Sequence, residues 1–222
     1  MCGRFTLTVD PAELKAHFES INFPEKYAAR YNIAPSQAIL AIPNDGRNAA
    51  DFFLWGLIPS WAKDASMGSR MINARGETLA EKPAYRGAYK YKRCLIPADG
   101  FYEWKAQVGT KAKSPYFIHL KDGKPFAFAG LWDEWHAADG SPLRTCTIIT
   151  TSPNPLMAPI HDRMPVILRP EDYDEWLDPA PRTPDSLQRL IAAFPPDLME
   201  AYPVSALVNS PSNDRAECMQ PA

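Results

Sequence analysis

The sequence predicts an α+β protein of one domain, in which a largely antiparallel β-sheet carries a few peripheral helices. The chain has 222 residues, a length that one domain can reach in all-β and mixed folds. Hydrophobic residues make up 45% of it and there are 6 tryptophans, enough to build a core without disulfides or metals. The 23 prolines exceed the usual share of roughly 5% and separate short apolar runs. This spacing favours short strands and ordered loops.

The first expected element is a strand over residues 3–9, where β-forming residues alternate weakly almost at the N-terminus. A terminus tied into a sheet loses the freedom of a chain end, so the residues before the strand should be held in place. Asp10, Pro11 and Glu13 then predict a helix that reaches about Phe18. Asp is a favoured N-cap, Pro a favoured first helical residue, and Glu suits the first turn.

Further strands are expected where short runs of apolar and β-branched residues are bounded by turn residues. These runs are residues 38–42, 52–55, 93–97, 101–105, 116–120, 126–131, 145–151 and 166–168. Asp99-Gly100 and Asp122-Gly123 lie between consecutive strands, and Asp-Gly pairs favour tight turns. We therefore expect two hairpins in a largely antiparallel region.

Two helices are expected near the C-terminal end, one after Pro170 through Trp176 and one after Thr183. The second carries Leu187 to Phe194 at helical spacing. Both should cover the sheet from outside.

No shift in composition marks a domain boundary, so residues 1–222 are expected to form one domain, with a tail from about Ser210 that frays. No stretch approaches the roughly 20 apolar residues of a membrane span, and the N-terminus lacks the features of a secretion signal. We expect a cytoplasmic protein, associated with the nucleoid if the source is bacterial, without a membrane partner.

The formal net charge of −2 hides an uneven distribution. From Trp61 to Lys124 there are 13 Lys or Arg against 6 Asp or Glu, a net +7, while the remainder has 11 against 20, a net −9. Such a basic segment can follow phosphates or form an ordinary solvated surface, and both interpretations stay open. Its candidate residues for phosphate contacts are Arg70, Arg75, Arg86, Lys90, Lys92, Arg93 and Lys105.

The cysteines Cys2, Cys94, Cys146 and Cys218 lie far apart and form no C-x-x-C pair, so neither a metal site nor a disulfide framework is expected, and no cofactor. Cys2 differs from the others because removal of Met1 would leave a terminal aminothiol. An α-amine titrates near roughly 8, so a useful fraction is a neutral nucleophile that can attack an aldehyde. The thiol can then close a five-membered thiazolidine ring on the same carbon. The alternative is an inert buried cysteine.

Polar residues in apolar surroundings add candidate site residues. Asn73 and Arg75 point to the same side of an extended segment, suited to orienting a sugar and binding its phosphate, or else form a turn with a surface arginine. Glu103 stands between aromatic residues that would raise its pKa, so that it can donate a proton, unless it faces solvent. His161, in a proline-bounded loop, suits proton transfer or a structural role.

Taken in order, three motifs and these clusters resemble the SRAP family, the abasic-site processing proteins once named SOS response-associated peptidases. The motifs are Met-Cys-Gly-Arg-Phe at the start, Tyr-Asn-Ile-Ala-Pro at 31–35 and Trp-Gly-Leu-Ile-Pro-Ser-Trp at 55–61. The match runs from Cys2 to at least Val208. The resemblance implies a single SRAP domain with a twisted, mostly antiparallel, barrel-like β core, peripheral helices and a positively charged channel for single-stranded DNA.

The resemblance also implies roles by position. Cys2 looks like the residue that joins to the ring-opened sugar, and Asn73 like the one that orients the adduct. Glu103 resembles the family's acid-base carboxylate. His161 matches the histidine implicated in opening the sugar and in reversing the link.

The remaining implied residues contact DNA. Arg4, Arg75 and Arg163 fall where the family contacts phosphates, Trp61 where an aromatic side chain separates bases, and Thr150 in the pocket. Gly76, after Arg75, is often another residue in relatives.

The expected function is an abasic-site sensor that binds single-stranded DNA and forms a thiazolidine crosslink through Cys2, shielding the lesion from strand cleavage. Self-removal of Met1 and a weak lyase activity through the imine are part of it, and replication-fork proteins are candidate partners. One alternative is an N-terminal-nucleophile cysteine peptidase or amidase that uses Cys2, His161 and Glu103. Another is a binding module for single strands in which Cys2 is dispensable.

Overall fold

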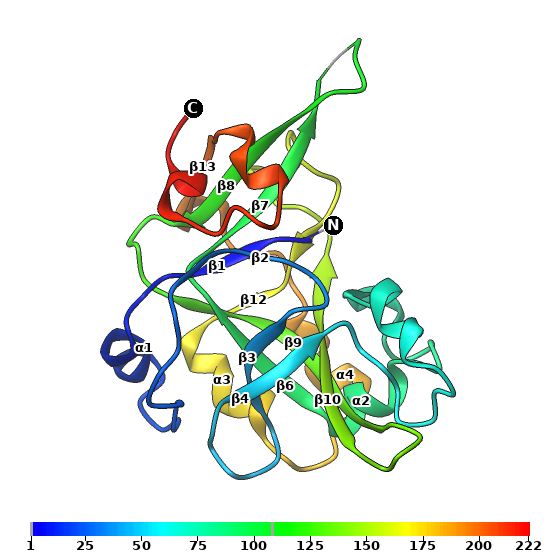
Figure 1. Cartoon of the computed structure of the whole chain (residues 1–222). Helices are drawn as coiled ribbons and strands as arrows, with labels where there is room; N and C mark the ends of the chain where they lie inside the picture. The colour runs from blue at the N-terminus through cyan, green and yellow to red at the C-terminus, as the bar shows by residue number, and fades with distance from the viewer. Residues whose placement is uncertain (1, 108) are drawn as a thin grey trace.

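The computed structural model describes residues 2–107 and 109–222 (Figure 1). The described strands are β1 (Phe5–Leu7), β2 (Arg30–Ile33), β3 (Ala38–Pro43), β4 (Asp51–Trp55), β5 (Asn73–Arg75), β6 (Arg93–Ala98), β7 (Gly100–Ala106), β8 (Lys113–Leu120), β9 (Phe126–His136), β10 (Pro142–Thr151), β11 (Met164–Pro165), β12 (Ile167–Leu168) and β13 (Met199–Pro203). The described α-helices are α1 (Pro11–His17), α2 (Arg86–Tyr91), α3 (Tyr173–Leu177) and α4 (Pro184–Leu187). Short 3₁₀ turns are η1 (Ala65–Arg70), η2 (Gly76–Thr78), η3 (Pro170–Asp172), η4 (Gln188–Leu190), η5 (Pro196–Leu198), η6 (Ala206–Asn209) and η7 (Ala216–Met219).

The core of the molecule is a closed barrel. Its strands follow the order β10-β4-β3-β6-β9, and the ring closes because β9 also pairs with β10, from Pro142↔His136 to Ile148↔Gly130. Most pairings are antiparallel, but β10 runs parallel to β4 and to β5. The predicted α+β class and the mostly antiparallel, barrel-like core are confirmed.

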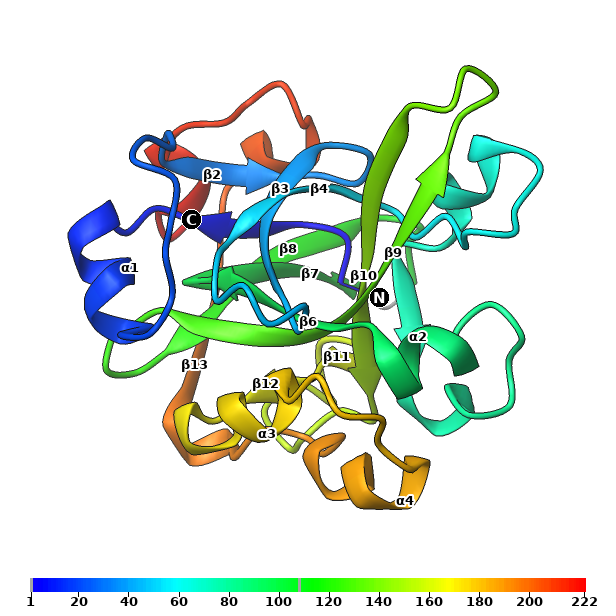
Figure 2. The ribbon, with the colours of Figure 1, turned by 90° about the horizontal axis from the view of Figure 1, so that it is seen from below.

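A second sheet, in the order β13-β8-β7-β1-β2, packs against the barrel (Figure 2). Both predicted hairpins are wrong, because Asp99-Gly100 links β6 of the barrel to β7 of this sheet, and Asp122-Gly123 links β8 back to β9. These turns are corners between sheets. An Asp-Gly pair specifies a local bend, whereas the partner of each strand depends on which distant apolar surfaces it buries.

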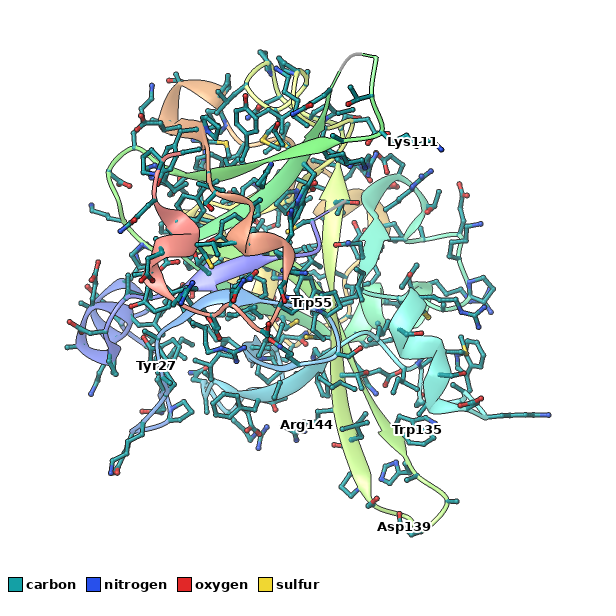
Figure 3. All side chains as sticks on the ribbon, turned by 45° about the horizontal axis from the view of Figure 1, so that its top comes forward. Tyr27, Trp55, Lys111, Trp135, Asp139 and Arg144 are labelled. Atoms are coloured by element: carbon teal, nitrogen blue, oxygen red, sulfur yellow. The ribbon has the colours of Figure 1, made fainter. Side chains whose placement is uncertain are left out.

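The interior is formed by large apolar side chains of both sheets. The Phe5 ring on β1 meets the rings of Trp55 and Phe128 edge to face, with centroids 5.2 and 5.7 Å away. Trp55 lies toward the middle of the molecule, whereas Asp139 lies at the tip of the ribbon that β9 and β10 form (Figure 3). The first strand is thus clamped between sheet neighbours and core.

The predicted first helix is confirmed as α1, and the Asp10 side chain accepts from the backbone N–H of Ala12 and Glu13. The helix predicted after Pro170 is present as η3 followed by α3. The one predicted after Thr183 is shorter than its pattern, because α4 passes directly into the 3₁₀ turn η4.

Arg93 is a correction to the predicted basic face. Its side chain is fully buried, and its guanidinium donates to the backbone carbonyls of Trp176, Lys90 and Asp178. It therefore joins α2 to α3 and cannot contact the phosphates of a nucleic acid. The sequence shows that a cation is present but not that five backbone carbonyls, three of them from distant residues, surround its guanidinium.

The segment after Ser210, for which fraying is expected, makes contacts with the second sheet. Asp214 accepts hydrogen bonds from the backbone N–H of Tyr31 and Asn32, and Cys218 is buried. None of the described helices is long and apolar enough to cross a bilayer.

Candidate functional site

Cys2 lies just before β1, with its side chain fully buried. The Asn73 side chain donates from Nδ2 to the Cys2 carbonyl at 2.8 Å. Asn73 starts β5, and the parallel pairing Ile148↔Asn73 sets its place on β10. The N-terminal end of β1 lies beside β10 in both ribbon views (Figures 1 and 2). A short strand therefore brings an amide to the N-terminal segment.

The Cys2 thiol is neutral in this environment. Burial, and next the charge of Glu103, raise its pKa well above the ordinary value for a cysteine. The thiol donates weakly from Sγ to the Arg4 carbonyl at 3.8 Å. A nearby base must accept its proton when the sulfur reacts.

Glu103 lies on β7, in register with Tyr116 of β8, and its side chain is only 2% exposed. Burial raises the pKa of this carboxyl from its ordinary 4.5 to about 7. Near neutral pH the group is therefore divided between its acid and its base form, as a group that both gives and takes a proton requires.

His161 faces this carboxyl, with Nε2 3.8 Å from Glu103 Oε2. Burial lowers the pKa of the imidazole, so the ring is mainly neutral at pH 7. Its Nδ1 accepts the backbone N–H of Arg163 at 3.1 Å. Asp162 Oδ1 also lies 2.9 Å from Nδ1, but that side chain is 88% exposed, so water solvates its carboxylate. The Arg163 N–H can donate only to an unprotonated Nδ1, so the proton of the neutral ring lies on Nε2, toward Glu103.

Arg163 is held rigidly beside this histidine. Its two terminal nitrogens donate to both Glu77 carboxylate oxygens at 2.6 and 2.9 Å, and to the Thr150 carbonyl at 2.7 Å. The Thr150 hydroxyl is a further acceptor at 3.3 Å. Glu77 was not among the predicted site residues, although it lies in the same cluster as Asn73 and Arg75. The sequence feature that could have identified Glu77 is a carboxylate close to residues predicted to contact phosphates.

Two buried polar atoms at the site lack a hydrogen-bond partner among the described residues. They are Asn73 Oδ1 and Arg163 Nε. Buried polar groups are almost always paired, and an exception in a native protein is explained by strain, by a catalytic role or by a bound water or ion.

Arg4 and Trp61 are placed outside this cluster. Arg4 donates to Asn32 Oδ1 at 2.9 Å and to the carbonyls of Val208 and Asn209 at 2.7 and 3.2 Å. These bonds tie the first residues to the C-terminal segment. Trp61 is 60% exposed. Their expected DNA contacts, like that of the exposed Arg75, remain predictions.

The structure thus brings together Cys2, Asn73, Glu103 and His161, and Arg163 links His161 to Thr150 through its hydrogen bonds. The group joins a buried nucleophile to an amide donor, an acid-base carboxyl and a neutral imidazole, which suits covalent addition with proton transfer. Among the described residues no cluster of three or more His, Cys, Asp or Glu side chains is arranged to hold a metal.

The closed barrel and this group of residues together define a class of protein with an N-terminal cysteine site. The chain is a member of the family described as SOS response associated peptidase (SRAP), whose model matches residues 1–211.

Two named relatives match most of this chain. The abasic site processing protein YoqW of Bacillus subtilis is 53% identical, covering 99% of this chain and 99% of the relative. HMCES of Gallus gallus, also named an abasic site processing protein, is 36% identical over 75% of this chain and 56% of the relative. A crystal structure of a protein from Bacteroides thetaiotaomicron superposes with a TM-score of 0.89 at 27% identity, covering 100% of both chains.

A Cβ at Gly76 would lie 2.3 Å from Ile191 Cγ2, so a larger residue after Arg75 would require this side chain to shift.

Proposed function

We propose that this chain is an abasic-site processing protein that binds single-stranded DNA and joins Cys2 covalently to the ring-opened sugar. The observation that carries the proposal is the position of Cys2 as second residue, buried beside Asn73 and within the electrostatic influence of Glu103. The names of the relatives agree with it.

The first steps use the α-amine of Cys2. The protein itself exposes this amine by removing Met1. The amine attacks the sugar aldehyde and forms a C–N bond, giving a carbinolamine. Protonated Glu103 donates its proton to the hydroxyl, which leaves as water, and a protonated imine (iminium) and a Glu103 carboxylate result. At a pKa of about 7 a large fraction of Glu103 holds that proton near neutrality.

The last step closes the ring. The Cys2 sulfur adds to the iminium carbon while the Glu103 carboxylate takes the thiol proton, and the C=N electron pair moves to the nitrogen. The thiazolidine therefore forms with a net loss of one water, and Glu103 is protonated again. Asn73 orients the adduct, and neutral His161 supplies proton transfer while the sugar ring opens. Because the ring removes the imine, the β-elimination that cuts the strand is blocked. An imine that escapes ring closure gives weak lyase activity.

Selection rests on the missing base, because only such a nucleotide presents an aldehyde to a buried thiol. Arg75, Arg163 and Arg4 are proposed to contact phosphates and Trp61 to stack on a base, with Thr150 in the pocket wall. Such contacts hold a single strand without reading its sequence. In this setting replication-fork proteins are candidate partners, in the cytoplasm or at the nucleoid.

The decisive experiment is an intact-mass measurement on the protein mixed with an oligonucleotide that carries one abasic site. We expect loss of Met1 and a single adduct of protein plus oligonucleotide minus one water. An oligonucleotide with all its bases is the control and should give no adduct. Cys2→Ser keeps the amine and should be trapped only with a reductant. Stable crosslinking by Cys2→Ala at the wild-type rate would contradict the ring mechanism.

The family's description favours a second candidate, a peptidase that uses Cys2 as nucleophile. It predicts turnover of peptide substrates and no mass adduct with abasic DNA. The same measurement, with a peptide library in place of the oligonucleotide, separates the two.

A further inference from the structure

Among the described residues, the guanidinium of Arg4 is held by neutral acceptors only. Nη1 donates to the Asn32 side-chain oxygen at 2.9 Å and to the Val208 carbonyl at 2.7 Å, and Nη2 donates to the Asn209 carbonyl at 3.2 Å. Arg4 Cζ lies 5.9 Å from the centroid of the Trp104 ring. No carboxylate of residues 2–107 or 109–222 forms an ion pair with this half-buried cation. Its positive charge therefore has no counter-charge within that part of the chain.

Three of the five N–H donors of Arg4 are taken by these acceptors. Within the described part of the chain, the Nε–H and one N–H of Nη2 have no acceptor. Nε and Nη2 share one edge of the guanidinium plane, and a pair of N–H groups on one edge is what arginine uses to bind a phosphate in bidentate fashion. The donors that remain therefore belong to an edge that suits a phosphate.

Asn32 fixes this orientation from a buried position. It lies on β2 with its side chain fully buried, and Nδ2 donates to the carbonyls of Val208, Ser210 and Asn213 at 3.2, 3.0 and 2.8 Å. Only the nitrogen of an amide can donate to carbonyls, so these bonds turn the Asn32 oxygen toward Arg4. An amide oxygen holds the guanidinium without cancelling its charge, whereas a carboxylate in the same place would neutralise it.

The C-terminal segment holds Asn32 in place, and it lies beside β2 in both ribbon views (Figures 1 and 2). Asp214 in this segment accepts from the backbone N–H of Tyr31 and of Asn32 at 2.5 and 3.0 Å. The same segment thus binds both the backbone and the side chain of Asn32. Asn32 belongs to the Tyr-Asn-Ile-Ala-Pro motif at 31–35, for which the proposed chemistry has no role.

We propose that Asn32 is a positioning residue, which orients the free edge of Arg4 toward a phosphate of the DNA strand and leaves the charge of Arg4 uncancelled. The inference rests on the proposed function for the phosphate contact of Arg4. Arg4 follows Cys2 by two residues, a span of at most about 7 Å, so this phosphate lies close to the abasic sugar. Asn32 itself does not touch the DNA and acts on binding through Arg4.

Four variants separate positioning from support of the fold. Arg4→Met removes the charge, and Asn32→Ala removes the acceptor that orients it. Asn32→Asp keeps the size of the side chain and the acceptor but adds a negative charge beside Arg4, so it serves as the test if Asn32→Ala does not fold. Asn213→Ala is the matched control, because it removes a hydrogen bond of the same segment, from Nδ2 to the Leu207 carbonyl at 2.8 Å, without contacting Arg4.

The measurement is the affinity for an undamaged single strand, by fluorescence anisotropy at several salt concentrations, on variants whose folding is checked by circular dichroism. One phosphate contact on a single strand contributes about 0.7 to the slope of log K against log salt. Arg4→Met, Asn32→Ala and Asn32→Asp should each reduce the slope by about 0.7 and weaken binding about tenfold, the lower end for a hydrogen bond to a charged group. The Arg4→Met/Asn32→Ala double variant should show no further reduction. Asn213→Ala should be less stable and yet bind with the wild-type slope.

A wild-type slope for Asn32→Ala or Asn32→Asp beside a reduced slope for Arg4→Met would overturn the proposal and leave the proposed function intact. A further reduction in the double variant would overturn it too, because Asn32 would then act apart from Arg4. Failure of the proposed function has separate signatures. Wild type would form no adduct with abasic DNA, or Arg4→Met would keep the full slope and show that Arg4 contacts no phosphate. The second of these outcomes would overturn both proposals.

Discussion

Replacing Glu103 by glutamine is expected to stabilise the folded protein above neutral pH while slowing its chemistry. Burial raises the pKa of this carboxyl from 4.5 to about 7, so the folded protein holds the proton more tightly than the unfolded chain does. Between these two pKa values the folded state binds more protons, and its free energy of unfolding therefore falls as the pH rises. Above pH 7 the free energy of unfolding has lost the full contribution set by the difference between the two pKa values.

The magnitude follows from the two pKa values. A tenfold change in an equilibrium constant is about 1.4 kcal/mol. The raised pKa of Glu103 therefore lowers the free energy of unfolding by about 3 kcal/mol at pH 8 and by about 1 kcal/mol at pH 5. Glutamine carries no charge at either pH. Its own packing cost is the same at both, so the advantage of Glu103→Gln over wild type should grow by about 2 kcal/mol from pH 5 to pH 8. For a chain of this size that is a shift in Tm of roughly 4 to 8 °C.

The assay is thermal unfolding of wild type and Glu103→Gln at both pH values, without DNA. Glu25→Gln, at an exposed position, is the control and should change stability by less than about 0.5 kcal/mol at either pH. An equal difference between Glu103→Gln and wild type at pH 5 and pH 8 would refute the buried, proton-holding carboxyl. In the crosslinking assay the same variant should be about 10²- to 10⁴-fold slower, with binding of undamaged strands unchanged.

Three further variants test the framework of the site. Gly100→Ala places a Cβ 2.2 Å from Phe117 Cζ and should lower the free energy of unfolding by about 1–3 kcal/mol in denaturant titrations. Adding Phe117→Leu should restore part of the lost stability. Glu77→Gln should cost less than about 1 kcal/mol, because Glu77 is half exposed, yet slow crosslinking by loosening Arg163; unchanged crosslinking would make the pair structural only. Arg4→Met should increase amide hydrogen exchange in the C-terminal segment, and unchanged protection there would contradict its anchoring role.

Much of the local structure and most residues of the candidate site could be predicted from residue order. The start of α1 follows from Asp10 and Pro11, whose side chains act within one turn of their own backbone. The chemistry available to Cys2 follows from its place after Met1. The carboxyl of Glu103 was expected to have a raised pKa from its aromatic neighbours, and burial raises it.

Other features depended on contacts between distant segments. The bend at Asp99-Gly100 was visible, but its strands pair with β9 and β1 rather than with each other. Arg93 belonged to the predicted basic face and is buried among carbonyls instead.

The sequence by itself determined the position of Cys2 directly after Met1, the short strands and helix starts, and the membership in a family, since each of these rests on neighbouring residues or on motifs in order. The tertiary structure alone decided which strands close the barrel, that Glu77 holds Arg163, and that Tyr91 shares a pocket with Trp61. The physical reason is that burial and pairing energies depend on what a side chain meets after the chain has folded back on itself, and residues far apart in sequence supply those partners.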